Sequence, residues 1–329
     1  MKVLFIGGTG NISTSTSKLC VERGINLYLL NRCNRNVVIP GSNIIRADIS
    51  QTKDIASALQ DHKWDVVVNW IAFNTDDIKR DYNLFKGKTK QYIFISSASA
   101  YQKPASHPII TESTPLKNPY WKYSQNKIAC EEMLNTFYRN EDFPITIVRP
   151  SYTYDTVIPV AIGGFNEFTI IDRMKKGQKI IVHGDGTSLW TNTHANDFAI
   201  GFTGLIGNSQ AIGHSFHITS DEILTWDQIY TMVANGAGVE PNIVHIPSDF
   251  ISGFNEDLRC TLLGDKSYSV IFDNSKIKMF VPEFKAIIPF SEGIKKTLLW
   301  FEKDPARQIV LKETNELMDK IISQYERAN

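Results

Sequence analysis

Three side chains in this sequence are of the types that move a proton to or from an alcohol. Tyr123 and Lys127 stand four positions apart in a stretch that predicts a helix, so both lie on one face of it. An ammonium near a phenol favours the phenolate and lowers the pKa of the tyrosine, which suits Tyr123 to act as a general acid or base. Ser97, in a serine cluster that follows an apolar run, is the third candidate.

The tyrosine–lysine spacing is not specific by itself, because Tyr82 and Lys86 have it too. Position in the chain separates the two pairs. Tyr123 lies between two predicted strands, so its helix is expected to present it at the carboxyl ends of the strands, where open α/β sheets bind ligands. Tyr82 lies in a short connection before the serine cluster and is expected to be packed or exposed. For Tyr123 and Lys127 the alternative is a solvated pair on a helix surface.

A glycine-rich loop near the N-terminus, residues 7–13, follows an apolar run and opens a helical stretch. This context is typical of a dinucleotide-binding loop, in which Gly7 permits a tight turn and Gly10 a close approach of the backbone to the pyrophosphate. The phosphates would meet N–H groups at the positive end of the helix. Ser13 replaces the third glycine of the pattern, and an ordinary turn is the alternative. The expected cofactor-binding residues of this loop are Gly7, Thr9, Gly10, Asn11 and Ile12.

The second predicted strand ends without the carboxylate that usually holds the adenosine ribose. It ends in Asn31 and Arg32, with Arg35 shortly after. Because arginine suits a 2′-phosphate, the sequence favours NADP(H) over NAD(H) by a modest margin. The alternative is that Arg32 and Arg35 are solvated loop charges without a role in cofactor binding. Asp48 ends the expected third strand, and it is predicted either to receive the adenine amino group or to form a turn.

These candidates need a scaffold, and the first half of the chain alternates short β-branched apolar runs with amphipathic stretches. This alternation is typical of a Rossmann-type, doubly wound parallel sheet of the α/β class. The helix after Gly10 is expected to end at Gly24, and a shorter helix is predicted from Thr52 to Gln60. The predicted strands are Lys2 to Ile6, Asn26 to Leu30, Val66 to Asn69, Tyr92 to Ser96 and Ile145 to Arg149.

After Pro150 glycines and prolines interrupt this pattern, which predicts a smaller, mixed C-terminal domain for the substrate. Asp304 and Pro305 predict the start of a final helix whose apolar stripe packs on the core. The other elements predicted here are strands at Lys179 to His183 and Ser215 to Thr219 and a helix from Thr225 to Asn235.

The length of 329 residues suits one large domain or two smaller ones that share a core. We predict an NAD(P)-binding Rossmann domain at residues 1–155, completed by parts of 190–220. The substrate-binding region is predicted at residues 156–329. This division places the cofactor and the substrate in different halves of the chain.

Charge balance and cysteine spacing exclude several classes of protein. The 35 lysines and arginines equal the 35 acidic residues and no basic patch is visible, so no nucleic-acid or membrane partner is expected. The four cysteines lack C-x-x-C spacing, so no metal is expected and they are interpreted as small buried residues. The N-terminal apolar run is too short for a signal peptide, which predicts a cytoplasmic location. The expected partners are a small-molecule substrate and, as a possibility, a second copy of the chain.

The combination of motifs resembles the extended short-chain dehydrogenase/reductases, specifically the NAD-dependent epimerase/dehydratase family. The glycine loop follows the first strand, and Ser97 precedes Tyr123 by 26 positions in front of the segment Tyr123-Ser124-Gln125-Asn126-Lys127. Further matches to the family are Glu131, Val148-Arg149-Pro150, Gly184-Asp185-Gly186 and His194-Ala195-Asn196-Asp197.

The resemblance implies a role for each matching residue. Tyr123 would move a proton to or from a substrate hydroxyl while hydride passes to or from a nicotinamide. Lys127 would hold the nicotinamide ribose, and Ser97 would bond the reacting oxygen. The chain after Pro150 would lie against the nicotinamide carboxamide, and Asn69 would sit near the cofactor after the fourth strand.

The sequence departs from the family pattern in three places. Ala98-Ser99 stand where the 4,6-dehydratases carry an Asp-Glu pair, so elimination of water is disfavoured. Trp190 stands where an arginine often clamps the substrate diphosphate in this family. Trp190 is expected either to stack on a ring or to fill the core. Arg173 or Arg259 is the alternative source of positive charge for the diphosphate. The link from Asn83 to Gln91 leaves little room for a helix before the serine strand, which indicates an atypical branch.

The leading hypothesis is an NAD(P)-dependent oxidoreductase or epimerase acting on a secondary alcohol of a sugar or sugar nucleotide. A second hypothesis is an NADPH-dependent reductase of a non-nucleotide substrate, motivated by Arg32 and Trp190. A third is a catalytically silent regulator that binds a cofactor or RNA, since a fold alone does not determine function.

Overall fold

A seven-stranded parallel sheet forms the centre of the molecule. The structure, a computed structural model, describes residues 1–33, 37–51, 55, 58–59 and 62–328. The strand order is β12-β7-β5-β4-β1-β2-β3, and every neighbouring pair is parallel. The strands are β1 (Lys2–Ile6), β2 (Asn26–Asn31), β3 (Asn43–Arg46), β4 (Val66–Asn69), β5 (Tyr92–Ile95), β7 (Ile145–Pro150) and β12 (Ser215–Ile218).

This sheet confirms the predicted Rossmann-type fold of the α/β class. Strand β1 lies between β2 and β4, so the chain leaves it in one direction and later returns to its other side. Such a switch point opens a crevice at the carboxyl ends of the strands, where ligands bind. The strands β1 and β4 match their predicted bounds, whereas β2, β5 and β7 each differ by one residue at the carboxyl end.

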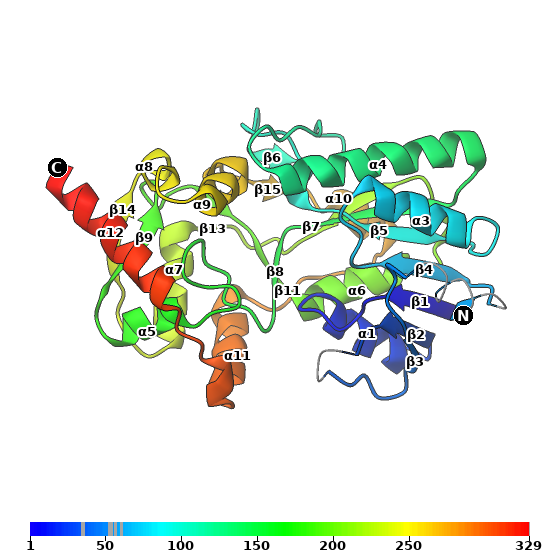
Figure 1. The fold of residues 1–329 in the computed structure, drawn as a ribbon, viewed down its shortest axis with the longest axis horizontal. Helices are drawn as coiled ribbons and strands as arrows, with labels where there is room; N and C mark the ends of the chain where they lie inside the picture. Colours follow the sequence, from blue (N-terminus) through cyan, green and yellow to red (C-terminus); the bar gives the residue numbers. More distant parts are fainter. Residues whose placement is uncertain (34–36, 52–54, 56–57, 60–61, 329) are drawn as a thin grey trace.

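Helices cover both faces of the sheet (Figure 1). One face carries α1 (Ser13–Glu22), α6 (Ala195–Leu205) and α10 (Ser275–Phe280), whose apolar side chains share a core with the strands. The other face carries α3 (Thr75–Phe85) and α4 (Lys122–Glu141). Strands β1, β4, β5 and β7 are buried on both sides, which explains why their sequences are nearly continuous apolar runs, whereas β3 at the edge is mostly exposed.

A helix precedes the serine strand, contrary to the expectation that the link was too short for one. Helix α3 begins at Thr75, well before Asn83, because Asn74 and Asp77 form a reciprocal capping box at its start. Tyr82 therefore lies on a helix, where its ring stacks on Phe137 with 4.0 Å between centroids. It is half-buried and packed on Phe137, one of the two alternatives expected, and the connection that contains it is helical.

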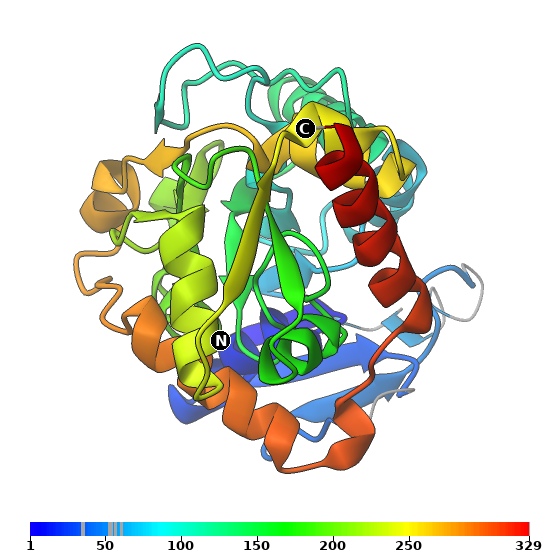
Figure 2. The same ribbon diagram turned by 90° about the vertical axis from the view of Figure 1, so that its left-hand side faces the viewer.

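The second half of the chain forms short strand pairs and helices around a second core (Figure 2). The strand pairs are β8 (Tyr152–Tyr154) with β11 (Asn192–His194), β9 (Lys179–His183) with β14 (Asn242–Ile246), β10 (Leu189–Trp190) with β13 (Leu224–Thr225), and β6 (Ile109–Ile110) with β15 (Ile271–Phe272). The helices are α5 (Thr169–Lys175), α7 (Trp226–Gly236), α8 (Ser248–Ser252), α9 (Glu256–Thr261), α11 (Phe290–Glu302) and α12 (Lys312–Ala328). Short helical turns cover Ala98–Ala100, Ser209–Ala211, Leu262–Lys266 and Pro305–Arg307.

Three sequence predictions for this half are confirmed closely. Strand β9 has its predicted bounds, Thr225 caps α7, and the strand predicted at Ser215 joins the central sheet beside β7. Strand β12 thus belongs to the central sheet, and the inclusion of parts of residues 190–220 in the cofactor domain stays a prediction. The boundary at residue 155 itself remains a prediction.

The start of the final helix differs from the prediction. Asp304 caps only a short turn at Pro305–Arg307, and α12 begins later, at Lys312. Its apolar stripe packs on the core as expected, with Met318 and Ile321 fully buried. The helix predicted from Thr52 to Gln60 falls largely outside the described residues. Within the described part of the chain, no helix combines the length and apolarity needed to cross a bilayer.

The cysteines are less uniformly buried than the sequence predicts. Cys20 and Cys130 are buried, but Cys260 is half-buried and Cys33 is exposed. The interpretation as a buried residue is wrong for Cys33 because it lies in the loop after β2, outside both cores.

Candidate active site

A cleft of about 1670 Å³ opens at the carboxyl ends of the central strands and continues between the two cores. This volume exceeds that of a pocket for one drug-sized molecule, so a dinucleotide and a second ligand both have room. Asn69 is not among the described residues that line it, and Arg35 lies outside the described residues. The predicted site residues that line the cleft are Gly7, Thr9, Gly10, Asn11, Ile12, Asn31, Arg32, Asp48, Ser97, Tyr123, Lys127 and Pro150.

The glycine loop fits a pyrophosphate. Gly7 and Gly8 have φ values of 94° and 102°, in the region that favours glycine. A Cβ added at Gly8 would lie 2.8 Å from a methyl group of Leu29, so only a glycine fits there. Among the described residues no side chain caps the start of α1, and its first turn carries no acid. The positive end of this helix therefore lies at the cleft with no acidic residue in its own first turn.

Asn11 joins the glycine loop to the segment that follows β7. Its side-chain amide donates to the carbonyl of Thr153 at 2.9 Å and accepts from the backbone N–H of Thr156 at 3.2 Å. This side chain therefore positions the loop against the second half of the cleft. Ser13 has a comparable role within the loop, because its hydroxyl accepts from the N–H of Gly10 at 2.8 Å.

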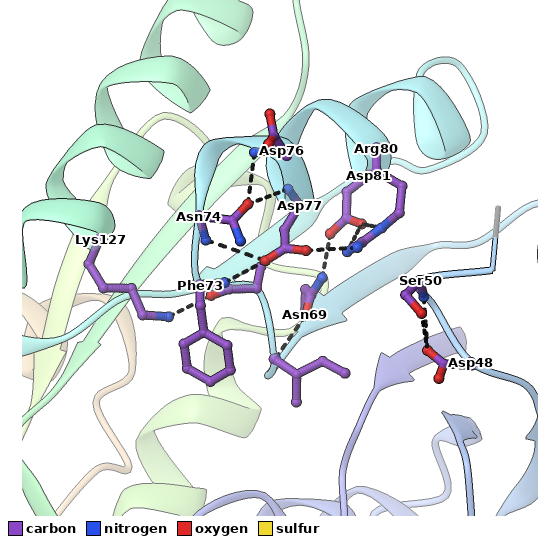
Figure 3. A network of polar contacts seen from close by, with 12 residues as sticks. Asp48, Ser50, Asn69, Phe73, Asn74, Asp76, Asp77, Arg80, Asp81 and Lys127 are labelled. Carbon is purple, nitrogen blue, oxygen red and sulfur yellow. Dashed lines mark hydrogen bonds and ion pairs between the residues drawn. The ribbon is translucent and has the colours of Figure 1, made fainter. Parts of the chain in front are cut away.

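The loops after β2 and β3 bring Arg32 to Asp48. The guanidinium lies 3.7 Å from the carboxylate, and the Arg32 side chain is 66% exposed. Asp48 also forms a turn with Ser50, accepting from its N–H at 2.9 Å and its hydroxyl at 2.8 Å (Figure 3). These hydrogen bonds, followed by the nearby Arg32, hold the pKa of Asp48 below its ordinary value. Asn31 accepts a hydrogen bond from the backbone two residues on, at 3.0 Å.

The side chain of Asn69 bonds within a buried network behind the cleft. Its amide donates to Asp81, and its oxygen accepts from the N–H of Ile71 at 2.8 Å (Figure 3). Asp81 also accepts from the hydroxyl of Tyr92 at 2.6 Å and pairs with Arg80 at 2.9 Å. Burial raises the pKa of Asp81, and these donors oppose the shift. Asn69 thus shapes the loop after β4, whose next residues line the cleft.

The structure brings Tyr123 and Ser97 together. Tyr123 lies in the first turn of α4, and its phenol is hydrogen-bonded to the hydroxyl of Ser97. The Ser97 hydroxyl is also 2.9 Å from that of Ser99, which accepts from Ser124 at 2.7 Å. A chain of hydroxyl groups therefore connects the end of β5 to the start of α4.

The pKa of Tyr123 is raised, not lowered as the sequence predicts. Burial is the largest cause; the hydrogen bond from Ser97 opposes it, and the negative charge of Asp265 adds to it. The prediction is wrong for the protein alone because the Lys127 ammonium lies 5.7 Å from the centre of the tyrosine ring and is bonded elsewhere. Desolvation therefore outweighs the attraction of the ammonium.

Lys127 is buried and held by two backbone carbonyls. Its ammonium donates to the oxygens of Ala72 at 2.7 Å and Ile95 at 2.8 Å, and the side chain is 2% exposed. It also lies 4.6 Å from the ring centre of Phe73 (Figure 3) and 4.9 Å from that of Phe94. Burial lowers the pKa of Lys127 to about 8. Because an ammonium has three N–H groups, one remains beyond these two bonds.

The substrate half of the cleft contains charged residues that the sequence analysis missed. Lys103, Asp265 and Lys266 all line it, and both lysines are buried. No motif contains them, and more than 160 positions separate Lys103 from the other two, so only the fold brings them together. Trp190 also lines the cleft; it is 2% exposed and packs on Trp226 at 5.1 Å, as its alternative role in the core predicts.

The chain is similar in sequence to proteins of known name. The chloroplast stem-loop binding protein of 41 kDa b from Arabidopsis thaliana is 25% identical over 268 residues, which are 77% of this chain and 68% of that protein. The UDP-glucose 4-epimerase of Lactobacillus helveticus is 29% identical over 154 residues, which are 41% of this chain and 46% of the epimerase. The chain thus covers less than half the length of that epimerase.

A solved structure shares the fold over nearly the whole chain. It is the UDP-glucuronic acid 4-epimerase from Bacillus cereus in complex with UDP-glucuronic acid and NAD, with a TM-score of 0.72 and 18% identity over 92% of this chain and 99% of that one. The sequence profile of the NAD dependent epimerase/dehydratase family matches residues 3–219, which include the glycine loop, Ser97, Tyr123 and Lys127. This chain belongs to the NAD dependent epimerase/dehydratase family.

Proposed function

We propose that the chain is an NAD(P)-dependent, epimerase-type oxidoreductase that acts on a secondary alcohol of a sugar or sugar nucleotide. The observation that carries the proposal is the Tyr123 phenol hydrogen-bonded to Ser97 inside the cleft onto which the glycine loop opens. A phenol and a hydroxyl that share a hydrogen bond can both reach one substrate oxygen, as proton transfer requires.

In this proposal Tyr123 accepts the proton of the substrate hydroxyl and later returns it, while Ser97 holds the same oxygen. Lys127 uses its remaining N–H to hold the nicotinamide ribose, since two carbonyls already occupy the others. A nicotinamide cofactor held in this cleft would supply the hydride chemistry at the substrate carbon. The protein's own contribution is to orient the substrate and move the proton.

The cofactor would lie along the glycine loop, with its pyrophosphate at the start of α1 and its nicotinamide beside Pro150. The uncapped helix end and the positive φ values of Gly7 and Gly8 both fit that placement. Asp48 is the residue proposed to receive the adenine, and residues 1–155 with parts of 190–220 form the cofactor domain. The remaining chain shapes the substrate pocket.

We also propose a modest preference for NADP(H) over NAD(H). Strand β2 ends without a carboxylate that would repel a 2′-phosphate, and Arg32 lines the cleft there with most of its side chain in solvent. An exposed guanidinium can turn from Asp48 to a phosphate at small cost, because surface ion pairs contribute little to stability.

Epimerisation is favoured over dehydration because Ala98 and Ser99 offer no carboxylate pair to eliminate water. The relatives' names include both 4-epimerases and a dTDP-D-glucose 4,6-dehydratase, so this choice of reaction rests on Ala98 and Ser99. A net reductase of a non-nucleotide substrate is the alternative within the same chemistry. An epimerase regenerates its cofactor, whereas a reductase consumes it.

The test uses purified protein with NAD or NADP and either UDP-glucose or UDP-glucuronic acid. Interconversion at carbon 4, followed by chromatography or NMR, is expected with no steady change in nicotinamide absorbance. Tyr123→Phe should lower turnover about 100-fold or more while cofactor binding is retained. Full turnover by this variant contradicts the proposed role of Tyr123, and a steady absorbance change identifies a net reductase.

RNA binding is a second candidate, motivated by the name and 25% identity of the Arabidopsis stem-loop binding protein. The equal numbers of basic and acidic residues weigh against it, because RNA binding relies largely on basic side chains that neutralise many phosphates. Salt-sensitive binding of a stem-loop RNA, without turnover of either sugar nucleotide, would favour this candidate over the enzyme.

A further inference from the structure

The loop that follows β4, residues 70–73, covers the ammonium of Lys127. The carbonyl of Ala72 accepts a hydrogen bond from that ammonium at 2.7 Å, and the ring centre of Phe73 lies 4.6 Å from it (Figure 3). The second carbonyl that holds the ammonium belongs to Ile95, at the end of strand β5. One of the two acceptors is therefore fixed by the sheet, whereas the other depends on how this loop is held.

The loop is tied to helix α3 at two points. At its start, the side-chain oxygen of Asn69 accepts from the N–H of Ile71 at 2.8 Å, and the amide of Asn69 donates to Asp81. At its end, the carboxylate of Asp77 accepts from the N–H of Phe73 at 2.9 Å. The position of the carbonyl between these two points therefore depends on both contacts.

Arg80 links the two carboxylates that hold the loop. Its guanidinium lies 2.8 Å from Asp77 and 2.9 Å from Asp81, so the three side chains form one ion-pair network on α3 (Figure 3). The Arg80 side chain is 14% exposed and that of Asp81 is 1% exposed. Because partly buried pairs are screened only weakly by salt, these contacts hold the loop and the first turns of α3 in one arrangement.

Asp81 is a costly residue to place between a helix and a sheet. Its carboxylate accepts from the Asn69 amide, from the hydroxyl of Tyr92 at 2.6 Å, and from Nε and Nη2 of Arg80 at 3.1 and 2.9 Å. A buried ion pair is weak evidence for stability, because apolar residues of similar volume often replace it without loss. A fully bonded carboxylate instead fixes its partners in one geometry, and Asn69 is the partner that leads out of the network to the loop.

We propose that Asp81 is a positioning residue for Lys127 that acts through Asn69 and the loop 70–73. The bond to Asp81 fixes the amide of Asn69, the oxygen of that amide fixes the start of the loop, and the loop presents a carbonyl to the ammonium. This arrangement needs only the contacts within the chain. Its consequence for the cofactor rests on the proposed function, in which the remaining N–H of Lys127 holds the nicotinamide ribose.

The pKa of Lys127 reports how completely the loop excludes water from it. Burial is the largest cause of the lowered pKa of about 8. The ring centre of Tyr123 lies 5.7 Å from the ammonium. The ionisable groups that oppose the shift are Cys130, Asp77 and Glu131. Because Asp81 is not one of these groups, a pKa that changes in an Asp81 variant reports a movement of the loop.

The experiment measures the pKa of Lys127 in the purified protein without cofactor. Competitive acetylation over a range of pH, followed by mass spectrometry of the peptide that contains Lys127, gives this value. In Asp81→Ala the released loop should admit water, so the pKa is expected to rise from about 8 toward its ordinary value of 10.5. Asp81→Asn keeps one acceptor oxygen and is expected to retain part of the depression. Asn69→Ala should raise the pKa as Asp81→Ala does, and it leaves Arg80 paired, so it is the second variant if Asp81→Ala does not fold.

Two other carboxylates serve as controls. Asp197 is buried on α6, on the opposite face of the sheet, and accepts from the N–H of Ile288 at 2.9 Å. Asp197→Ala should lower stability without changing the pKa of Lys127. Asp76→Ala removes an exposed carboxylate of α3 that pairs with Lys79, and it should change neither property. Urea denaturation gives the stability of each variant, so that effects at equal stability are compared.

Titration with NADH and NADPH separates this proposal from the proposed function. A raised pKa together with about tenfold weaker cofactor binding in the Asp81 or Asn69 variants supports both, since one hydrogen bond to the ribose is then lost. A raised pKa with unchanged cofactor affinity shows that Asp81 positions Lys127, but that Lys127 does not hold the ribose. An unchanged pKa in every folded variant of Asp81 and Asn69, or an equal rise in Asp197→Ala, overturns the proposal.

Discussion

The carboxylate of Glu131 and the guanidinium of Arg149 form a buried, two-pronged ion pair, with distances of 3.0 Å from Nε to Oε1 and 2.6 Å from Nη2 to Oε2. Both side chains are at most 6% exposed. The pair joins α4 to β7, and the hydroxyl of Ser96 donates to the same carboxylate at 2.5 Å. One turn of α4 separates Glu131 from Lys127, so the pair holds the helix that presents Lys127 and Tyr123 to the cleft.

Removing Glu131 should therefore cost much more than removing a carboxylate elsewhere on the same helix. Glu131→Ala leaves the Arg149 guanidinium buried without its partner and is expected to lower the free energy of unfolding by about 3–5 kcal/mol. Glu141→Ala breaks the exposed pair of Glu141 with Lys86 and should have little measurable effect. Urea denaturation followed by circular dichroism compares the two. Equal losses would show that Glu131 does not anchor α4 in this way.

The depressed pKa of Lys127 predicts how stability depends on pH. Its pKa is about 8 in the folded chain, against an ordinary value of 10.5. Between these two pKa values the unfolded chain binds more protons than the folded chain, so the free energy of unfolding rises with pH. Below both values Lys127 is charged in both states, and its buried charge destabilises the fold. From about pH 8 to about pH 10, wild-type protein should gain about 2 kcal/mol relative to Lys127→Met. Denaturation at several pH values measures this difference, and parallel curves for the two proteins contradict it.

Arg32 should influence the choice of cofactor. Arg32→Gln removes the guanidinium beside the expected 2′-phosphate and should weaken NADP(H) binding about tenfold, with NAD(H) binding little changed. Fluorescence titration with each reduced cofactor measures both affinities. Arg46→Gln is the control, because Arg46 is also exposed but does not line the cleft. An equal loss of both affinities in Arg32→Gln would show that Arg32 does not discriminate between them.

Gly8 should be irreplaceable in the cofactor loop. Gly8→Ala places a side chain at a φ of 102°, with its Cβ only 2.8 Å from the Leu29 side chain. We expect this variant to lose about 1–3 kcal/mol of unfolding free energy and to lose cofactor binding. Gly24→Ala has a similar backbone angle, 74°, but no atom within 4 Å of the added Cβ. It should keep cofactor affinity. Thermal melting with and without cofactor compares them, and unaltered stabilisation of Gly8→Ala by cofactor would contradict the prediction.

Local sequence patterns determined the parallel sheet, the glycine loop and the order of Ser97, Tyr123 and Lys127. A strand buried on both faces needs a continuous apolar run, and a tight turn needs glycine, so both features are visible within a few residues. The link from Asn83 to Gln91 does not reveal helix α3, because the start of that helix depends on a capping interaction between Asn74 and Asp77 further upstream.

Only the tertiary structure decided the remaining properties of the site. It turned Asn69 toward Asp81, gave Tyr123 a raised pKa, and brought Lys103 and Lys266 to the substrate half of the cleft. Each of these depends on segments far apart in the chain and on how completely they exclude water. Spacing along a sequence carries no information about either, because burial and long-range proximity arise only when the two halves of the chain pack together.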